Sequence, residues 1–298
     1  MPSKITKSKD NINKSSLKNK FKKELNISIY RKKIDKIDIK LHDLIMKRAI
    51  YVKNIAKQKK KHVNGKVDIY RPSREHEILV DLLKRHKGDF PLKVLINIWR
   101  NLIGGYISLQ GNLKISYDIS LENLVKDYFG ITMVYKRINS IDKSLNQLNR
   151  NSLDILVVPF PNNKQKWWLS LTKYKSLFII GSISEYIFEK PKAVILGKQD
   201  MEYTKINDVI YMITLEYKQT QLFEKYIKQK NYILLSKGKV DEKYISLLFS
   251  TLLSTQEEAN NNLYLLKNSE FKRSKIRIIG AMPYLSKKEL NDRKNKVQ

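Results

Sequence analysis

Cysteine is missing from the 298 residues, so a disulfide framework, a thiol nucleophile and a Cys-ligated metal site are excluded. Long apolar runs are missing as well. The most apolar stretch, residues 244–253, is much shorter than the roughly 20 residues of a transmembrane helix, and it contains serines. We therefore expect a chain without a membrane partner, located in the reducing cytoplasm.

Motifs for nucleotide and metal chemistry are also missing. The sequence has no GxxxxGK[ST], no GxGxxG and no HExxH. The four histidines, His42, His62, His76 and His86, show no ligand-like pairing with carboxylates. We therefore predict no metal site and no cofactor.

Positive charge is abundant: 59 Lys and Arg stand against 29 Asp and Glu, for a net charge of +30. The excess is spread along the chain, and aromatic-plus-basic RNA-binding signatures are missing. This distribution favours a general compositional bias over a nucleic-acid partner. A hydrophobic content of 42% is enough to build cores, and the length suits two or three domains.

Helical periodicity dominates the first third of the chain. Residues 1–24 are polar and basic, which predicts a disordered tail. No Pro or Gly interrupts residues 25–62, where apolar positions recur every three or four residues, namely Ile27, Tyr30, Ile34, Ile37, Leu41, Leu44, Val52 and Ile55. A helix of that length spans about 57 Å and needs a partner helix, which predicts a homodimer. Pro72 opens a second predicted helix, and a third carries an apolar stripe from Leu95 to Leu113.

Beyond residue 116 short β-rich runs alternate with helices, which indicates α/β or α+β structure. The predicted strands are 131–135, 153–159, 177–181, 193–197, 209–216, 232–236, 244–253 and 276–280. The predicted helices are 141–148, 221–229 and 255–266.

Four polar residues interrupt the apolar stripes of the three predicted helices: Arg48, Lys59, Glu75 and Gln110. A single long cation could extend from a stripe edge into water. Several cations that face a helical interior with one carboxylate need an anion instead, which indicates an anionic ligand. Arg31, next to Tyr30, is a further candidate that could reach a partner subunit.

Five segments with this order and spacing resemble the all-helical chorismate mutase family. They are 30–38 (YRKKIDKID), 44–48 (LIMKR), 56–59 (AKQK), 70–75 (YRPSRE) and the span from 98–100 (IWR) to 109–110 (LQ). The resemblance covers about residues 25–115. It implies an intertwined, all-α dimer of three-helix protomers that converts chorismate to prephenate.

The resemblance also implies roles for the polar residues. Arg31 of the partner subunit and Arg48 would hold substrate carboxylates, Lys59 and Gln110 would flank the ether oxygen, and Glu75 would accept a hydrogen bond from the substrate hydroxyl. Arg74 matches an Arg that precedes the Glu in the family. Arg71 and Tyr106 depart from the family pattern, since Asp and Ser are frequent at those places, which leaves the substrate contacts there open.

The rest of the chain resembles a degenerate prephenate dehydratase followed by an ACT module. Residues 152–159 (SLDILVVP) resemble a dehydratase strand, but the Thr-Arg-Phe motif is missing; residues 279–283 (IGAMP) resemble the end of an ACT module. We thus expect a multidomain α and α+β chain: a tail (1–24), a chorismate mutase domain (25–116), an α/β dehydratase-like region (117–205), an α+β ACT-like region (206–285) and a tail (286–298).

Three functional interpretations stay open at this point. The first is a chorismate mutase in phenylalanine and tyrosine biosynthesis. The second is a bifunctional mutase and dehydratase. The third is an inactive helical dimer that binds polyanions. An amino-acid effector at the C-terminal region is a further hypothesis, and a purely structural role is its alternative.

Overall fold

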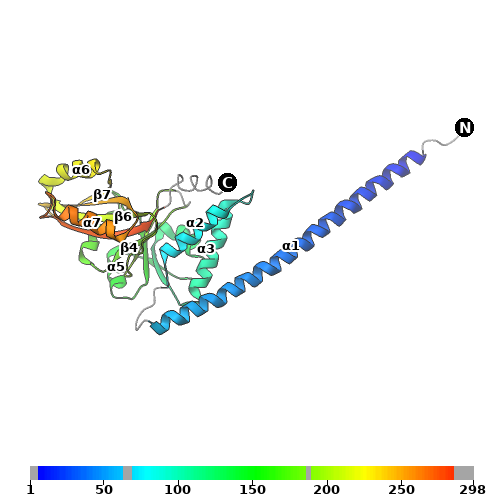
Figure 1. Ribbon diagram of the computed structural model, residues 1–298, viewed down its shortest axis with the longest axis horizontal. Coiled ribbons are helices and arrows are strands. Elements are labelled where there is room, and N and C mark those ends of the chain that lie inside the picture. Colours follow the sequence, from blue (N-terminus) through cyan, green and yellow to red (C-terminus); the bar gives the residue numbers. More distant parts are fainter. Residues whose placement is uncertain (1–5, 63–68, 186–188, 285–298) are drawn as a thin grey trace. The chain divides into compact units, whose positions relative to one another are not determined.

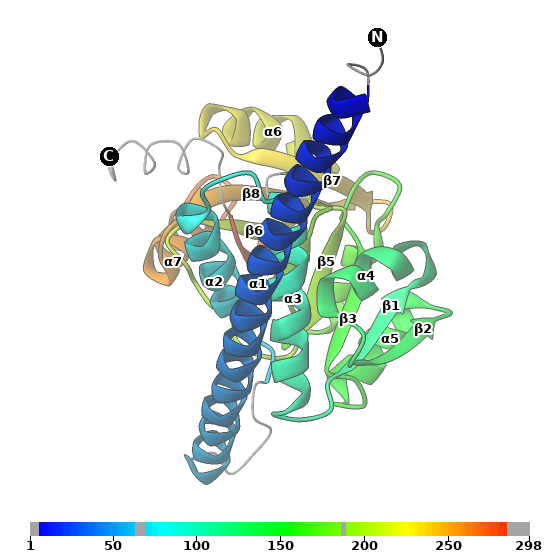
Figure 2. The same ribbon diagram turned by 90° about the vertical axis from the view of Figure 1, so that its right-hand side faces the viewer.

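The computed structural model describes residues 6–62, 69–185 and 189–284, and in the first helix it describes the side chains of residues 26–58. The chain divides into two compact units, residues 1–64 and residues 65–298. The first contains a single long helix, and the second contains the remaining helices around one large sheet (Figures 1 and 2).

Helix α1 (Thr6–His62) is 57 residues long. The predicted helix over 25–62 is confirmed, but α1 begins earlier, so residues 6–24 are helical where we predicted a disordered tail. The physical reason is that no Pro or Gly occurs between residues 3 and 64, so nothing stops the helix from propagating. Although α1 is long, no helix in the described ranges is apolar enough to cross a membrane.

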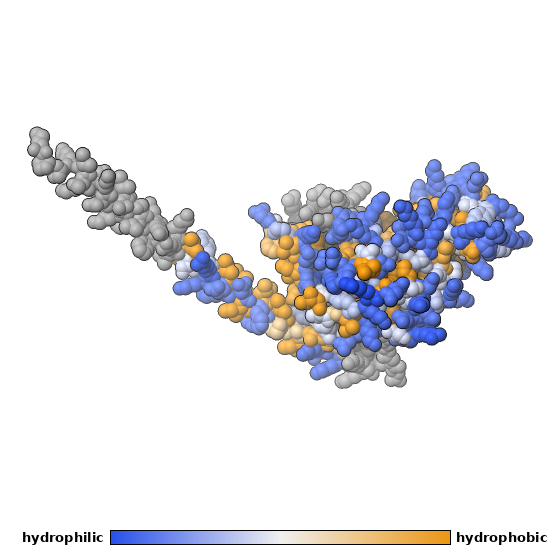
Figure 3. Space-filling view, turned by 180° about the vertical axis from the view of Figure 1, so that it is seen from behind, coloured by the Kyte–Doolittle hydropathy of each residue, from blue (hydrophilic) through white to orange (hydrophobic). Residues whose placement is uncertain are grey.

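The predicted apolar stripe of α1 is exposed to solvent in the single chain. Ile34 is 55% exposed, Ile37 61% and Leu44 63%. Figure 3 shows apolar side chains along the described part of the helix. Burial of such side chains, rather than local propensity, is what usually stabilises a helix in a protein.

The second unit begins with two helices, α2 (Pro72–Arg85) and α3 (Leu92–Ser108). The prediction that the third helix extends to Leu113 is wrong, because α3 ends at Ser108 and Gln110 lies in the turn that follows. Gly111 follows this turn, and a Cβ atom there would lie 2.5 Å from Cδ1 of Ile69, the end of a flexible side chain.

A single nine-stranded sheet follows, in the order β2-β1-β3-β5-β4-β9-β6-β8-β7. β1 is parallel to β2 and β3, β5 is antiparallel to β3 and β4, and β6 is antiparallel to β8 and β9. The strands are β1 (Lys114–Asp118), β2 (Val134–Ile138), β3 (Ile155–Pro159), β4 (Phe178–Ile183), β5 (Ala193–Gly197), β6 (Asn207–Glu216), β7 (Ile233–Lys239), β8 (Tyr244–Leu253) and β9 (Lys275–Pro283).

Four helices connect the strands: α4 (Glu122–Phe129), α5 (Ile141–Asn149), α6 (Thr220–Gln229) and α7 (Gln256–Lys267). The predicted order strand, helix, strand, strand, helix, strand beyond residue 206 is confirmed, as β6-α6-β7-β8-α7-β9. α7 begins with a capping box between Thr255 and Glu258. Assignment of this module as ACT-like stays a prediction.

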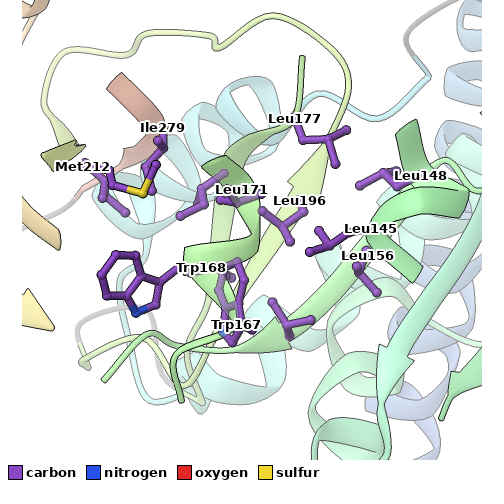
Figure 4. Packing of buried hydrophobic residues seen from close by; sticks show 14 of the residues in the cluster. Leu145, Leu148, Leu156, Trp167, Trp168, Leu171, Leu177, Leu196, Met212 and Ile279 are labelled. Carbon is purple, nitrogen blue, oxygen red and sulfur yellow. The ribbon is translucent and has the colours of Figure 1, made fainter. Parts of the chain in front are cut away.

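The two halves of the sheet join where β4 lies parallel to β9, through the pair Ile179 and Gly280. One apolar core crosses this joint, and it contains Leu196 of β5, Ile279 of β9 and Leu248 of β8. Figure 4 shows several of its members, including Trp168. The indole of Trp168 is fully buried and donates to Ser236 Oγ at 3.3 Å. Burial of the joint makes residues 65–298 one unit.

Gly280 allows the close approach at this joint. A Cβ atom there would lie 2.5 Å from Ile179 Cβ and 2.7 Å from Ile179 O. We predict that Gly280→Ala lowers the free energy of unfolding by about 1–3 kcal/mol, the usual cost of overpacking. The matched control is Gly105→Ala in α3, where an added Cβ meets no described atom within 4 Å; it should raise stability by about 0.5–1 kcal/mol. Urea unfolding measures the stability of both variants. Equal changes in the two would contradict a close approach at Gly280.

Candidate functional site

Glu75 is a buried carboxylate in the first turn of α2, with 6% of its surface exposed. Pro72 occupies the start of the helix, where its missing N–H costs nothing. The Glu75 backbone N–H donates to the Arg71 carbonyl at 3.1 Å. A carboxylate near a helix N-terminus is also favoured by the helix dipole.

Aromatic and cationic side chains from other elements surround this carboxylate. Arg100 of α3 is 8% exposed, and its guanidinium lies over the ring of Tyr128 of α4, 4.7 Å from the centroid. The Tyr128 hydroxyl is 3.3 Å from the hydroxyl of Tyr70. Phe129 packs edge-on against Tyr128 at 4.9 Å between ring centroids. Helices α2, α3 and α4 thus together position the group.

Burial dominates the electrostatics of Glu75. It raises the pKa of the carboxyl to about 7, while the positive charge of Arg100 and the Tyr128 hydroxyl act in the opposite direction. Burial also raises the pKa of the Tyr128 hydroxyl above its usual value, and the neighbouring Glu75 adds to this. Glu75 can therefore hold or release a proton near neutral pH.

Glu75 lines a pocket of about 520 Å³ within the second unit. Polar residues in its lining include Glu75, His76, Arg100, Ser182, Ser184, Glu189, Lys190, Asp208 and Ser250, and apolar ones include Leu79, Phe160, Leu234 and Met282. A concave, mostly apolar site with a few polar groups is typical of small-molecule binding. No cluster of three or more potential metal ligands occurs in the described part of the chain.

The predicted site residues of the second unit do not gather in this pocket. Arg71 forms an ion pair with Glu202, Nε to Oε1 at 2.5 Å, and Arg74 forms one with Glu77, Nη1 to Oε2 at 2.9 Å. Tyr106 is buried in α3. The Gln110 amide donates to the Tyr106 carbonyl at 3.4 Å. Among these residues and Glu75, only Glu75 lines the pocket.

The other predicted site residues lie in the first unit. Arg31 and Arg48 are exposed on α1. Lys59 belongs to the same helix, but its side chain lies outside the described residues.

Sequence reasoning missed Arg100, Tyr128 and Asp208. A signal for Arg100 was available, because it follows Ile96 by four residues and so lies on the buried stripe of α3. No comparable signal marks Tyr128 or Asp208, since each reaches Glu75 or the pocket only through the tertiary fold.

Comparison with known proteins finds a family match for the N-terminal part of the chain. Residues 30–111 match the family model "Chorismate mutase type II". This segment is similar to the chorismate mutase type II domain. The resemblance predicted from the sequence is thereby confirmed, and the domain contains α2, α3 and most of α1 but neither Tyr128 nor Asp208.

Two relatives of this chain are longer proteins. It is 29% identical over 140 residues to a bifunctional chorismate mutase/prephenate dehydratase of Aquifex aeolicus, a match that covers 44% of this chain and 38% of the relative. It is 24% identical over 141 residues to the protein of the same description from Pseudomonas aeruginosa, covering 45% and 39%. The matched region thus spans less than two-fifths of these relatives.

A solved structure is similar as well. The prephenate dehydratase from Streptococcus mutans matches with a TM-score of 0.43 and 12% identity, over 58% of this chain and 100% of that one.

The raised pKa of Glu75 gives a testable effect on stability. The folded state keeps the proton up to about pH 7, whereas the unfolded state releases it near pH 4.5, so raising the pH favours unfolding. We predict that the wild-type free energy of unfolding falls between pH 5 and 8 relative to that of Glu75→Gln, by up to roughly 3 kcal/mol. Urea unfolding at each pH measures this difference.

Glu77→Gln is the matched control, because Glu77 is an exposed neighbour on the same helix. That variant retains Glu75 and should keep the wild-type pH dependence. Parallel curves for wild type and Glu75→Gln would contradict a raised pKa.

Proposed function

We propose that this chain catalyses the rearrangement of chorismate to prephenate as a homodimer. The observation that carries the proposal is the match of residues 30–111 to the chorismate mutase type II model. The names of the two longer relatives also support it.

The chemistry suits the residues of this domain. The rearrangement is unimolecular and needs no nucleophile, metal or proton transfer. The enzyme must hold a dianion in its reactive conformer and stabilise the negative charge that grows on the ether oxygen. The guanidinium of an arginine can donate two parallel hydrogen bonds to a carboxylate. We assign this role to Arg48 and to Arg31 of the partner subunit.

The charge on the ether oxygen needs pre-placed donors, and we assign Lys59 and Gln110 to it. Glu75 accepts a hydrogen bond from the substrate hydroxyl in this proposal. Arg71, Arg74 and Tyr106 lie near these residues in the sequence, and we retain them as candidate substrate contacts.

The exposed stripe of α1 supports the dimer. Side chains such as Ile37 and Leu44 are more than half exposed in the single chain. A second copy that runs antiparallel along α1 would cover them, and it would bring Arg31 of the partner subunit to the site.

A dehydratase activity is the second candidate, because both longer relatives are described as bifunctional. The absence of a Thr-Arg-Phe motif from this sequence argues against it. An amino-acid effector on the predicted ACT-like module would be a regulatory addition to either activity.

The assay that separates these interpretations follows chorismate loss and measures prephenate and phenylpyruvate separately, without acid treatment. We expect prephenate alone. Phenylpyruvate in addition would establish the bifunctional alternative. No chorismate loss would overturn the proposal and favour an inactive helical dimer.

Replacement of one catalytic donor tests the site itself. We predict that Lys59→Ala lowers kcat roughly 10²- to 10³-fold, as for the loss of a pre-placed donor to a developing oxyanion. Lys57→Ala is the matched control, because two residues along a helix place Lys57 on the opposite side of α1. Near-normal turnover by Lys59→Ala would show that the site lies elsewhere.

A further inference from the structure

Tyr128 of α4 lies beside Glu75, although it belongs to a different part of the chain. The segment that matches the chorismate mutase model ends at residue 111, and α4 begins at Glu122. Tyr128 nevertheless lines the same pocket as Glu75 and Arg100. A residue from the C-terminal extension is thus part of the surroundings of a carboxylate that we assign to the mutase.

The packing of α3 against α4 fixes the position of Tyr128. A Cβ atom at Gly104 of α3 would lie 2.3 Å from the backbone oxygen of Phe129, so the two helices touch where a larger residue would clash. The guanidinium of Arg100, one turn earlier on α3, lies 4.7 Å from the centroid of the Tyr128 ring. Because Tyr128 is also buried, its hydroxyl is held in one place.

The hydroxyl of Tyr128 links Tyr70 to Glu75. It is 3.3 Å from the Tyr70 hydroxyl, and it acts on the Glu75 carboxyl as a hydrogen-bond partner. A hydroxyl has one proton to donate, and an ionised carboxylate can only accept. Tyr128 therefore donates to Glu75, and Tyr70 donates to Tyr128.

This arrangement leaves one oxygen of Glu75 for a ligand. Oε1 of the carboxyl is buried and has no hydrogen-bond partner among the described atoms. Buried polar atoms without a partner are rare in native proteins, and this one belongs to a residue that lines the pocket. It is an acceptor for a hydroxyl group bound there.

Other charged or titratable groups share the pocket lining with Glu75. Besides Tyr128 they are His76, Arg100, Glu189, Lys190, Asp208 and Tyr284. Burial has the largest effect on the pKa of Glu75 and raises it to about 7, whereas Arg100 and the Tyr128 hydroxyl act in the opposite direction. The bond from Tyr128 thus favours the charged form of the carboxyl, which is the stronger acceptor.

We propose that Tyr128 is a positioning residue for the mutase, whose hydroxyl, held by Tyr70, orients the Glu75 carboxyl so that its other oxygen accepts from the substrate hydroxyl. This inference rests on the proposed function, because it assigns Tyr128 to the same reaction. It adds that the extension beyond residue 111 supplies a residue on which turnover depends.

The pH dependence of chorismate turnover by the full chain tests the proposal, because kcat/KM reports ionisation in the free enzyme. In the wild type, kcat/KM should rise with pH through about 7, as Glu75 becomes charged. Tyr128→Phe removes a donor to the charged form and so raises the pKa of Glu75. The rise should move upward by roughly one pH unit, which lowers kcat/KM at neutral pH roughly fivefold and leaves it close to wild type at high pH.

Tyr211→Phe is the matched control. Tyr211 is also buried, it donates to the Ala259 carbonyl at 3.1 Å, and it lies outside the pocket lining. Its replacement removes a hydrogen bond of the same kind and should leave the pH profile in place. A Tyr128→Phe profile that is lower at every pH without moving would indicate a merely structural role and overturn the proposal.

Tyr70→Phe is the second variant, in case Tyr128→Phe fails to fold. Chained hydrogen bonds polarise one another, so loss of the donor to Tyr128 should move the profile in the same direction by a smaller amount. An NMR titration of isotope-labelled glutamate carboxyls measures the pKa of Glu75 without turnover. No turnover by the wild type would overturn the proposed function and this inference with it. Wild-type turnover with an unmoved Glu75 pKa in both variants would overturn this inference alone.

Discussion

The exposed apolar stripe of α1 is the constraint on which the rest of the account depends. A helix of 57 residues cannot be covered along its length by its own small chain, and its stripe side chains are exposed in the single chain. Burying a large apolar side chain contributes about 1.5–3 kcal/mol, so a row of them provides a strong drive to associate. The cations assigned to chorismate lie on this same helix. In the proposed dimer, covering the stripe and completing the proposed mutase site would be one event.

The second unit has a different organisation, because a single sheet joins its parts. The close approach of Gly280 to Ile179 allows β4 and β9 to pair, and this places β6 and β8 in the same sheet as the strands that follow α3. Glu75 belongs to the segment that matches chorismate mutase, yet Tyr128 lies outside that segment. Residues beyond the matched segment thus shape the environment of Glu75, and together with residues of α2 and α3 they line the pocket that contains Asp208.

Much of the architecture could be predicted from the sequence. Strands β5 and β8 lie at the predicted residues because each is a continuous apolar run, and α5, α6 and α7 agree within one residue at either end. β1 was not predicted, since three of the five residues in Lys114–Asp118 are polar and the segment becomes a strand through its neighbours β2 and β3. At the site, helical spacing singled out Glu75. Its partners Arg100 and Tyr128 could not be predicted in the same way. They reach Glu75 through the packing of three helices, and the spacing of residues within one helix carries no information about that packing.

The mass of the chain in solution tests the central claim most directly. Light scattering on the purified protein at micromolar concentration should give about 70 kDa, twice the 35.2 kDa of one chain. Leu41→Glu, within the stripe, should give a single-chain mass and lose chorismate turnover, whereas Lys40→Glu next to it should do neither. A wild-type mass of 35.2 kDa under conditions where chorismate is converted would contradict the account.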